Sequence, residues 1–285
     1  MFKKMKKIIS NALAVLGVVA CVGTFGACET NSPKVEMQLS FNGETYTLEY
    51  NLSRKITPTT VKHFLSLVEK EYYNGMCVHD YDGSDDAGQP AGKLYTGAYV
   101  YENNALALKN GKTYFETVAS YIPQSVWTDR EQNSPTYTLY GEFEANEFKV
   151  ENGAIKERFG SLVMYYRDRE HQDDVYVQRN SDGVPSLRNY EENSATSEFY
   201  ITLSPIVSSN KDYCVFATLD SKSVDTLSDF KSDLSAYIDE NFDGDKDQFV
   251  DEEEMHIEDP FGDFVEEFDV PVEPIVINYI KITKY

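Results

Sequence analysis

The sequence predicts a mainly β domain with two α-helices, and three observations support that fold class. Apolar residues alternate with polar ones along residues 35–50, 199–203 and 214–219, which is typical of half-buried strands. Apolar residues recur at helical spacing along residues 58–72 and 224–242. With 285 residues, of which 41% are hydrophobic and 13% aromatic, the chain can bury one sizeable core, so we expect one domain with insertions.

Residues 1–27 have the pattern of an export signal. Four lysines within the first seven residues precede an apolar run from Ile8 to Ala27, and such a segment is removed from the mature protein. Cys21 and Cys28 each follow small residues, which resembles a bacterial lipobox. We favour Cys28 as the lipidated residue because the chain turns polar directly after it. Cys21, or an ordinary cleaved signal with incidental cysteines, is the alternative.

Lipidation would anchor the protein at the outer face of the bacterial cytoplasmic membrane. Residues 28–34 are then a tether and residues 35–285 the folded domain. The net charge of −22 argues against nucleic acid as a partner and against a second, electrostatic contact with anionic lipid. In the folded part, Cys77 and Cys214 lie in apolar, strand-like surroundings, so we expect buried free thiols rather than a disulfide.

The domain begins with a β-hairpin followed by a helix. Asn42-Gly43 is a strong two-residue turn signal between two alternating stretches. Thr57 is a suitable N-cap, Pro58 suits the first helical position, and Asn74-Gly75 ends the helical pattern. The apolar stripe of this helix is expected to pack on the core.

Later stretches of the chain resemble the cyclophilins, the barrel-fold peptidyl-prolyl isomerases. The central one reads S-A-T-S-E-F-Y-I and is followed after a loop by V-F-A-T-L. Together with three other stretches it occurs in the order expected for that family. The four stretches cover residues 61–79, 140–148, 159–164 and 193–219. The resemblance implies a closed eight-stranded antiparallel β-barrel capped by two α-helices.

Three segments are expected to be insertions into that barrel. Residues at about 102–134 replace a short glycine-rich loop and suggest an inserted helical cap, and residues at about 167–192 read as a long, polar surface loop. Residues at about 241–269 are strongly acidic. The chain then closes with a strand at residues 274–282.

The resemblance implies peptidyl-prolyl cis-trans isomerisation without a cofactor. Amide resonance sets a barrier of ~18–20 kcal/mol to rotation of the X-Pro bond. Cyclophilins are understood to lower it with an arginine donor beside an apolar proline pocket. In this chain Asp80 stands at the position of that arginine, and a carboxylate has no proton to donate.

The same resemblance implies which residues form the site. Those at catalytic positions are His79, Asp80 and Tyr200. Tyr200 corresponds to the aromatic floor of the proline pocket, and a structural role at a strand end is the simpler interpretation of His79. Those expected to bind substrate are Leu94, Thr96, Met164, Tyr165, Phe199 and Tyr213. Glu198 stands in place of a glutamine. Arg167 or Arg169 could supply a substitute cation, although solvated loop arginines are the simpler interpretation.

The acidic insertion contains the spacing of an EF-hand calcium loop. Its expected ligands are Asp243, Asp245, Asp247, Phe249, Asp251 and Glu254. Gln248 replaces the glycine that normally allows the sharp turn. We therefore expect a structural calcium site, with a solvated acidic loop as the alternative.

Two functions are compatible with these observations. The first is an exported, lipid-anchored isomerase that assists the folding of exported proteins by acting on proline-containing segments. The second is a module of weak or no activity that keeps the cyclophilin fold to bind a peptide or protein, with a structural calcium site, because inheritance of a fold does not guarantee the activity. Asp80 is the feature that weakens the first.

Overall fold

A computed structural model describes residues 32–83, 85–86, 89–90, 92–118, 124–148, 155–167, 173–179, 183–205, 207 and 211–285. Eight strands form a closed antiparallel ring in the order β12-β9-β13-β2-β1-β16-β3-β6, which closes because β6 also pairs with β12. Their bounds are Phe199–Thr202, Leu162–Met164, Val215–Leu219, Glu44–Leu52, Lys34–Phe41, Val276–Lys284, Met76–Asp82 and Lys93–Glu102. The predicted eight-stranded barrel is confirmed.

A glycine allows the ring to close between β6 and β12. Gly97 has φ of +98°, and a Cβ atom there would lie 2.6 Å from the carbonyl oxygen of Ser197. The Ser197 hydroxyl donates a hydrogen bond to the carbonyl of Gly97 at 2.7 Å. Any side chain at this position would push the two strands apart, since only glycine combines this backbone conformation with so close an approach.

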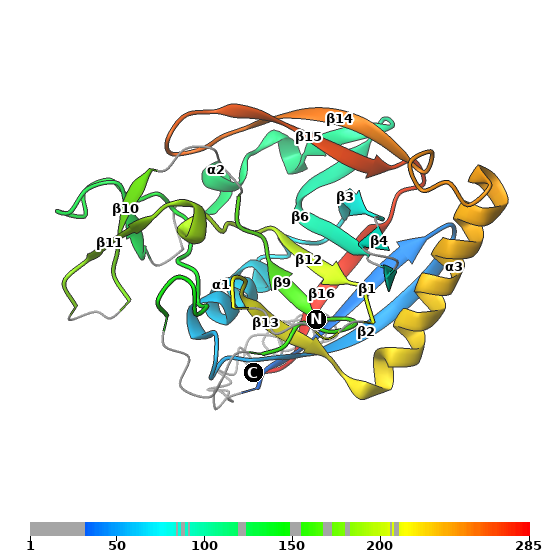
Figure 1. Ribbon diagram of the computed structural model, residues 1–285, viewed down its shortest axis with the longest axis horizontal. Coiled ribbons are helices and arrows are strands. Elements are labelled where there is room, and N and C mark those ends of the chain that lie inside the picture. Colours follow the sequence, from blue (N-terminus) through cyan, green and yellow to red (C-terminus); the bar gives the residue numbers. More distant parts are fainter. Residues whose placement is uncertain are drawn as a thin grey trace, which may run out of the picture.

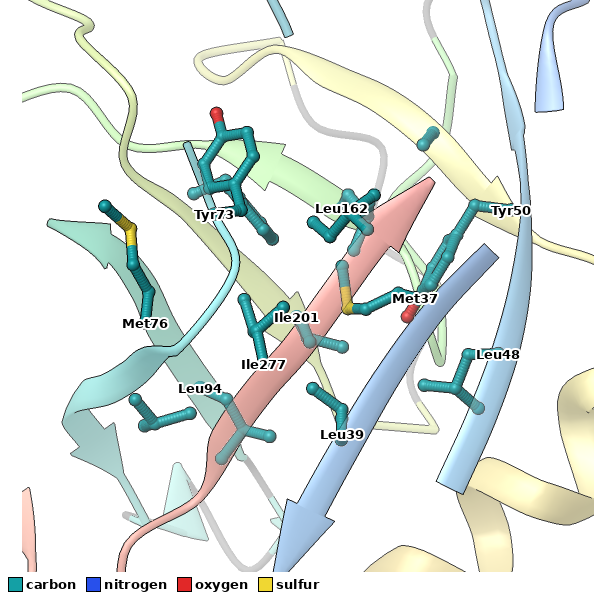
Figure 2. Packing of buried hydrophobic residues seen from close by; sticks show 14 of the residues in the cluster. Met37, Leu39, Leu48, Tyr50, Tyr73, Met76, Leu94, Leu162, Ile201 and Ile277 are labelled. Carbon is teal, nitrogen blue, oxygen red and sulfur yellow. The ribbon is translucent and has the colours of Figure 1, made fainter. Parts of the chain in front are cut away.

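The barrel interior is filled by side chains from all sides of the ring. Figure 2 shows Met37, Leu39, Leu94, Ile201 and Ile277 pointing into this interior. All are fully buried. Such close-packed aliphatic side chains supply most of the stabilisation of a domain of this size.

Two helices pack on the barrel. α1 (Pro58–Glu69) begins at Thr57 as expected, but the Thr57 side chain does not cap it. Glu142 does so instead, because its carboxylate accepts the backbone N–H groups of Thr59 (3.0 Å) and Thr60 (2.9 Å). The long α3 (Val224–Phe242) lies alongside β2 (Figure 1).

The first two insertions differ from expectation. The expected helical cap contains one short helix, α2 (Tyr114–Val118), together with β7 (Ala105–Leu108) and β8 (Val126–Trp127). The expected surface loop contains β10 (Asp174–Val177) and β11 (Ser186–Asn189), which form a small sheet with β8. These strands were missed because they are only two to four residues long. A further pair of two-residue strands, β4 (Asp85–Asp86) and β5 (Gln89–Pro90), follows β3.

The third insertion forms a β-hairpin, whose first strand includes the last part of the expected calcium loop. β14 (Val250–Ile257) pairs with β15 (Phe264–Pro271) along its whole length, and we call this element the acidic hairpin. It lies across the outside of the barrel over β3 and β6 (Figure 1). Phe268 and Val270 are buried between the hairpin and the barrel, so the hairpin is fixed by its own apolar contacts.

No helix among the described residues is long and apolar enough to cross a membrane. Cys77 and Cys214 are buried and free, as expected. The residues proposed as the signal and the lipidated cysteine, Cys28, lie outside the described residues. The division into signal, tether and domain therefore stays a prediction.

Candidate functional site

The candidate site is built on the outer face of four neighbouring strands. Asp80 on β3 pairs with Tyr95 on β6, Tyr95 pairs with Tyr200 on β12, and Tyr200 pairs with Val163 on β9. Residues directly opposite one another in antiparallel strands project to the same face. Asp80 and Tyr200 therefore lie on the same side of the barrel, as the sequence predicts, with Tyr95 between them.

A cavity of about 280 Å³ opens on this face, and tyrosine is the commonest residue type in its lining. We call it the tyrosine pocket and define it by Tyr95, Tyr165, Tyr200 and Tyr213. The ring centroid of Tyr95 lies 5.2 Å from that of Tyr200 and 5.6 Å from that of Tyr165. Tyr200 is buried, whereas Tyr213 is 48% exposed. The pocket thus has an aromatic floor and an accessible aromatic side chain at its mouth, which suits an apolar ring such as proline.

Charged side chains also line the tyrosine pocket. The ammonium group of Lys93 lies 5.1 Å from the centre of the Tyr200 ring. Glu191, Glu192 and Asp212 lie around the same cavity. Burial raises the pKa of Glu192, and the neighbouring charges of Glu191 and Asp212 raise it further. Sequence reasoning missed Lys93, Tyr95 and these acids.

Of the six residues expected to bind substrate, three line the tyrosine pocket and three do not. Tyr165, Tyr213 and Met164 line the tyrosine pocket, although Met164 also belongs to the core. Figure 2 shows Leu94 in the barrel interior, and Phe199 is buried there as well. Thr96 is fully buried, and its hydroxyl donates to the carbonyl of Cys77 at 2.7 Å.

Leu94, Thr96 and Phe199 therefore do not form the groove, and this corrects the expectation. Side chains alternate between the two faces of a strand, so the residue of β6 that faces Tyr200 is Tyr95. The expectation was displaced by one residue, which is enough to move a side chain from the outer face to the core.

Asp80 is covered by the acidic hairpin. The backbone N–H of Asp269 donates to Asp80 Oδ1 at 3.2 Å. Burial raises the pKa of Asp80 to about 6, even though this hydrogen bond lowers it. Asp80 lines a neighbouring hollow, and Tyr95 lines both this hollow and the tyrosine pocket. Asp80 itself is not among the residues that line the tyrosine pocket.

His79 is enclosed between aromatic rings. Its ring lies 5.3 Å from that of Tyr99 and 5.1 Å from that of Phe268 on the acidic hairpin, both edge-on. Burial, with a smaller effect of the Arg167 charge, lowers the pKa of His79 to about 3. A neutral, enclosed imidazole fits a packing role, and its Nε2 lies 3.8 Å from Glu198, too far for a hydrogen bond.

Arg167 joins the barrel to the acidic hairpin. Its guanidinium donates to Glu198 at 2.5 Å and to Glu266 of the hairpin at 2.6 Å, and it lies over the ring of Phe264. Tyr165 also donates to Glu266, at 3.1 Å. Arg167 is only 8% exposed, so the interpretation of this residue as a solvated loop arginine is wrong. Arg169, the other candidate, lies outside the described residues.

These two ion pairs hold Arg167 away from the tyrosine pocket. Both of its terminal nitrogens are engaged by carboxylates, and the side chain lines a separate, much smaller cavity of about 40 Å³. Burial raises the pKa of Glu198 despite the opposing effect of Arg167. The cation is therefore a structural clamp in this arrangement rather than a donor to a ligand.

The expected calcium ligands do not converge. Asp243 ends α3 in a left-handed conformation, Asp245 accepts the side-chain amide of Gln248 at 2.6 Å, and Phe249 is fully buried. Asp251 and Glu254 lie on β14, three residues apart, and so project to opposite faces. Asp247 donates its backbone N–H to Asp245. Throughout the described ranges, no group of three or more His, Cys, Asp or Glu could hold a metal ion.

A known protein family matches most of this chain. A family model described as cyclophilin type peptidyl-prolyl cis-trans isomerase/CLD matches residues 35–248. Two crystal structures of a Cryptosporidium parvum cyclophilin type peptidyl-prolyl cis-trans isomerase, one determined in the presence of the dipeptide Ala-Pro, are each 17% identical to the chain with a TM-score of 0.42. The two similarities cover 89% and 88% of this chain, and each covers 99% of the chain in the crystal structure. No curated protein matches significantly. The family model matches more than half of this chain, and the chain therefore belongs to the cyclophilin-type peptidyl-prolyl cis-trans isomerase family.

Proposed function

We propose that the chain binds proline-containing segments of exported proteins in the tyrosine pocket, and isomerises them slowly or not at all. The observation that carries this proposal is the cavity of about 280 Å³ with Tyr200 at its floor and Tyr95 and Tyr165 beside it. Tyr200 stands where the resemblance places the aromatic floor of the proline pocket. Rigid aromatic rings supply a large contact area at low entropic cost.

We favour binding over fast catalysis as the function because the hydrogen-bond donor expected at this site is missing. Isomerisation needs a hydrogen-bond donor that stabilises the twisted amide. At the arginine position Asp80 is covered by the hairpin backbone, and Arg167 is held by Glu198 and Glu266. The residues that would bind the ring are thus retained while the expected donor is missing.

A calorimetric titration with a neutral peptide, Ac-Ala-Ala-Pro-Ala-NH2, tests the proposal. We expect measurable binding that Tyr213→Ala weakens about tenfold, because a half-exposed tyrosine at the pocket mouth loses its contact. The matched control is Tyr285→Ala, a tyrosine of similar exposure that contacts Glu69 of α1 instead. Equal loss in both variants, or no binding by the wild type, would overturn the proposal.

Isomerase activity is the second candidate, and Lys93 is the observation that favours it. Its ammonium group is the basic group among the residues lining the pocket, 5.1 Å from the Tyr200 ring centre, and it can donate a hydrogen bond. A protease-coupled assay on a prolyl tetrapeptide separates the two candidates. Acceleration comparable to that of an arginine-containing cyclophilin, lost in Lys93→Met, would make this chain an enzyme.

For its location, the proposal is an exported domain held by lipid on Cys28. The support is the lysine-rich start, the apolar run and the small residues before the cysteine. Cys28→Ala is expected to release the protein from the membrane fraction, whereas Cys21→Ala is not; the reverse result would assign Cys21. Calcium is not part of the proposal, because Asp251 and Glu254 project to opposite faces of β14.

A further inference from the structure

The tyrosine pocket already holds one cation of the protein itself. Lys93 places its ammonium group 5.1 Å from the centre of the Tyr200 ring, within the range over which an aromatic face attracts a positive charge. Lys93 and Tyr95 lie two residues apart on β6 and therefore share the outer face with Tyr200. The aromatic floor is thus accessible to a cationic group from the pocket side.

The rim of the pocket has an excess of negative charge. Glu191, Glu192 and Asp212 line it, against a single basic residue, Lys93. Arg188 lies nearby and lowers the pKa of Glu192, so it offsets part of this charge, although its guanidinium is also paired with Glu147 at 2.8 Å. Burial raises the pKa of Glu192 most, and the charges of Glu191 and Asp212 raise it further against the opposing charge of Arg188. A positive side chain on a ligand would relieve this repulsion.

We propose that the tyrosine pocket selects prolyl peptides that carry lysine or arginine directly beside the proline. The proline ring rests on the aromatic floor, and the neighbouring cationic side chain reaches the carboxylate rim of Glu191, Glu192 and Asp212. This inference rests on the proposed binding of prolyl peptides and adds the class of sequence that is recognised. Rim charges of this kind act on specificity and association rate more than on the packing of the ring.

Calorimetric titration with four peptides tests it. Three have the form Ac-Ala-X-Pro-Ala-NH2, with X as Ala, Lys or Glu, and the fourth is Ac-Ala-Pro-Lys-Ala-NH2. At low salt we expect the better of the two lysine peptides to bind about tenfold more tightly than the alanine peptide and the glutamate peptide to bind more weakly. The advantage of lysine should shrink at 1 M NaCl, where the screening length falls to about 3 Å.

A charge-matched pair of variants locates the effect. Glu191→Gln/Glu192→Gln is expected to reduce the lysine preference to about twofold. Asp239→Asn/Glu240→Gln removes the same charge from exposed positions on α3 and should leave the preference unchanged. A preference that falls equally in both variants would mean that net charge, and not the pocket rim, selects the peptide, and would overturn the inference.

The outcomes separate this inference from the proposed function. If the alanine, lysine and glutamate peptides bind equally, the pocket binds proline without reading its neighbours, and only the inference fails. If no peptide binds, the proposed function and the inference fail together. If a fifth peptide without proline, Ac-Ala-Lys-Ala-Ala-NH2, binds as tightly as Ac-Ala-Lys-Pro-Ala-NH2, the site is a general cation site, which would also overturn the inference.

Discussion

Replacing Arg167 by methionine should destabilise the protein more than any loss of a surface ion pair. Arg167 is buried and holds two carboxylates, Glu198 with a side chain 6% exposed and Glu266 with one 23% exposed. Removing one partner of a buried ion pair typically costs about 3–5 kcal/mol, because the remaining charge stays buried without compensation. For a domain of this size, that loss corresponds to a melting temperature lower by about 10 °C.

The destabilisation caused by Arg167→Met should be larger at neutral pH than at acidic pH. Burial raises the pKa of Glu198 above its ordinary value of 4.5, and Arg167 is what opposes that rise. Without Arg167 the folded-state pKa of Glu198 rises further, so stability is lost as the pH increases through that higher value. Below pH 4.5 Glu198 is protonated in both the folded and the unfolded state. The difference in the free energy of unfolding between variant and wild type should therefore become smaller.

Arg188→Met is the matched control. Its guanidinium is paired with Glu147, whose side chain is 72% exposed, so about 0.2–1 kcal/mol is at stake. Urea unfolding of the wild type and both variants at pH 4 and pH 7.5 measures the three free energies. If Arg167→Met costs no more than Arg188→Met at pH 7.5, the buried clamp between barrel and hairpin does not exist.

Three further predictions follow from single groups. Asp80→Asn should raise the free energy of unfolding by about 2 kcal/mol at pH 8 and leave it unchanged at pH 3.5. The reason is that the folded-state pKa of Asp80 is about 6, so the charged carboxylate lowers stability above that pH. Equal effects at both pH values would refute this. Glu142→Ala should cost about 1–2 kcal/mol in urea unfolding by uncapping α1, and Glu144→Ala, an exposed neighbour, almost nothing. Millimolar calcium should shift the melting temperature of wild type and Asp243→Ala equally; a shift confined to wild type would show that the loop gathers its acids around the ion.

The parts of the fold that follow from local signals could be predicted. The Asn42-Gly43 turn, the start of α1 after Thr57 and the closed barrel are all found where the sequence places them. The face of β6 could not be assigned in the same way. Leu94 and Tyr95 are both large and apolar, so composition does not tell which of them faces the core, and only the register with Tyr200 does.

The composition of the acidic hairpin is the reason why its strands could not be predicted from the sequence. Four consecutive acids, residues 251–254, remove the alternation of polar and apolar residues that identifies a strand, and their spacing also matches a calcium loop. Its contacts with the barrel, such as Glu266 with Arg167, join residues 99 positions apart. No local pattern reports such a pair, which is why Arg167 reads as a loop residue in the sequence.

The location of the bound proline tests the central claim most directly. Titration of isotope-labelled protein with Ac-Ala-Ala-Pro-Ala-NH2, followed by NMR, reports which side chains lie within a few ångström of the proline ring. We predict intermolecular contacts from the ring to Tyr95, Tyr200 and Tyr213. Contacts confined to another surface, such as the hollow beside α3 at Phe159 and Lys231, would contradict the assignment of the tyrosine pocket as the binding site.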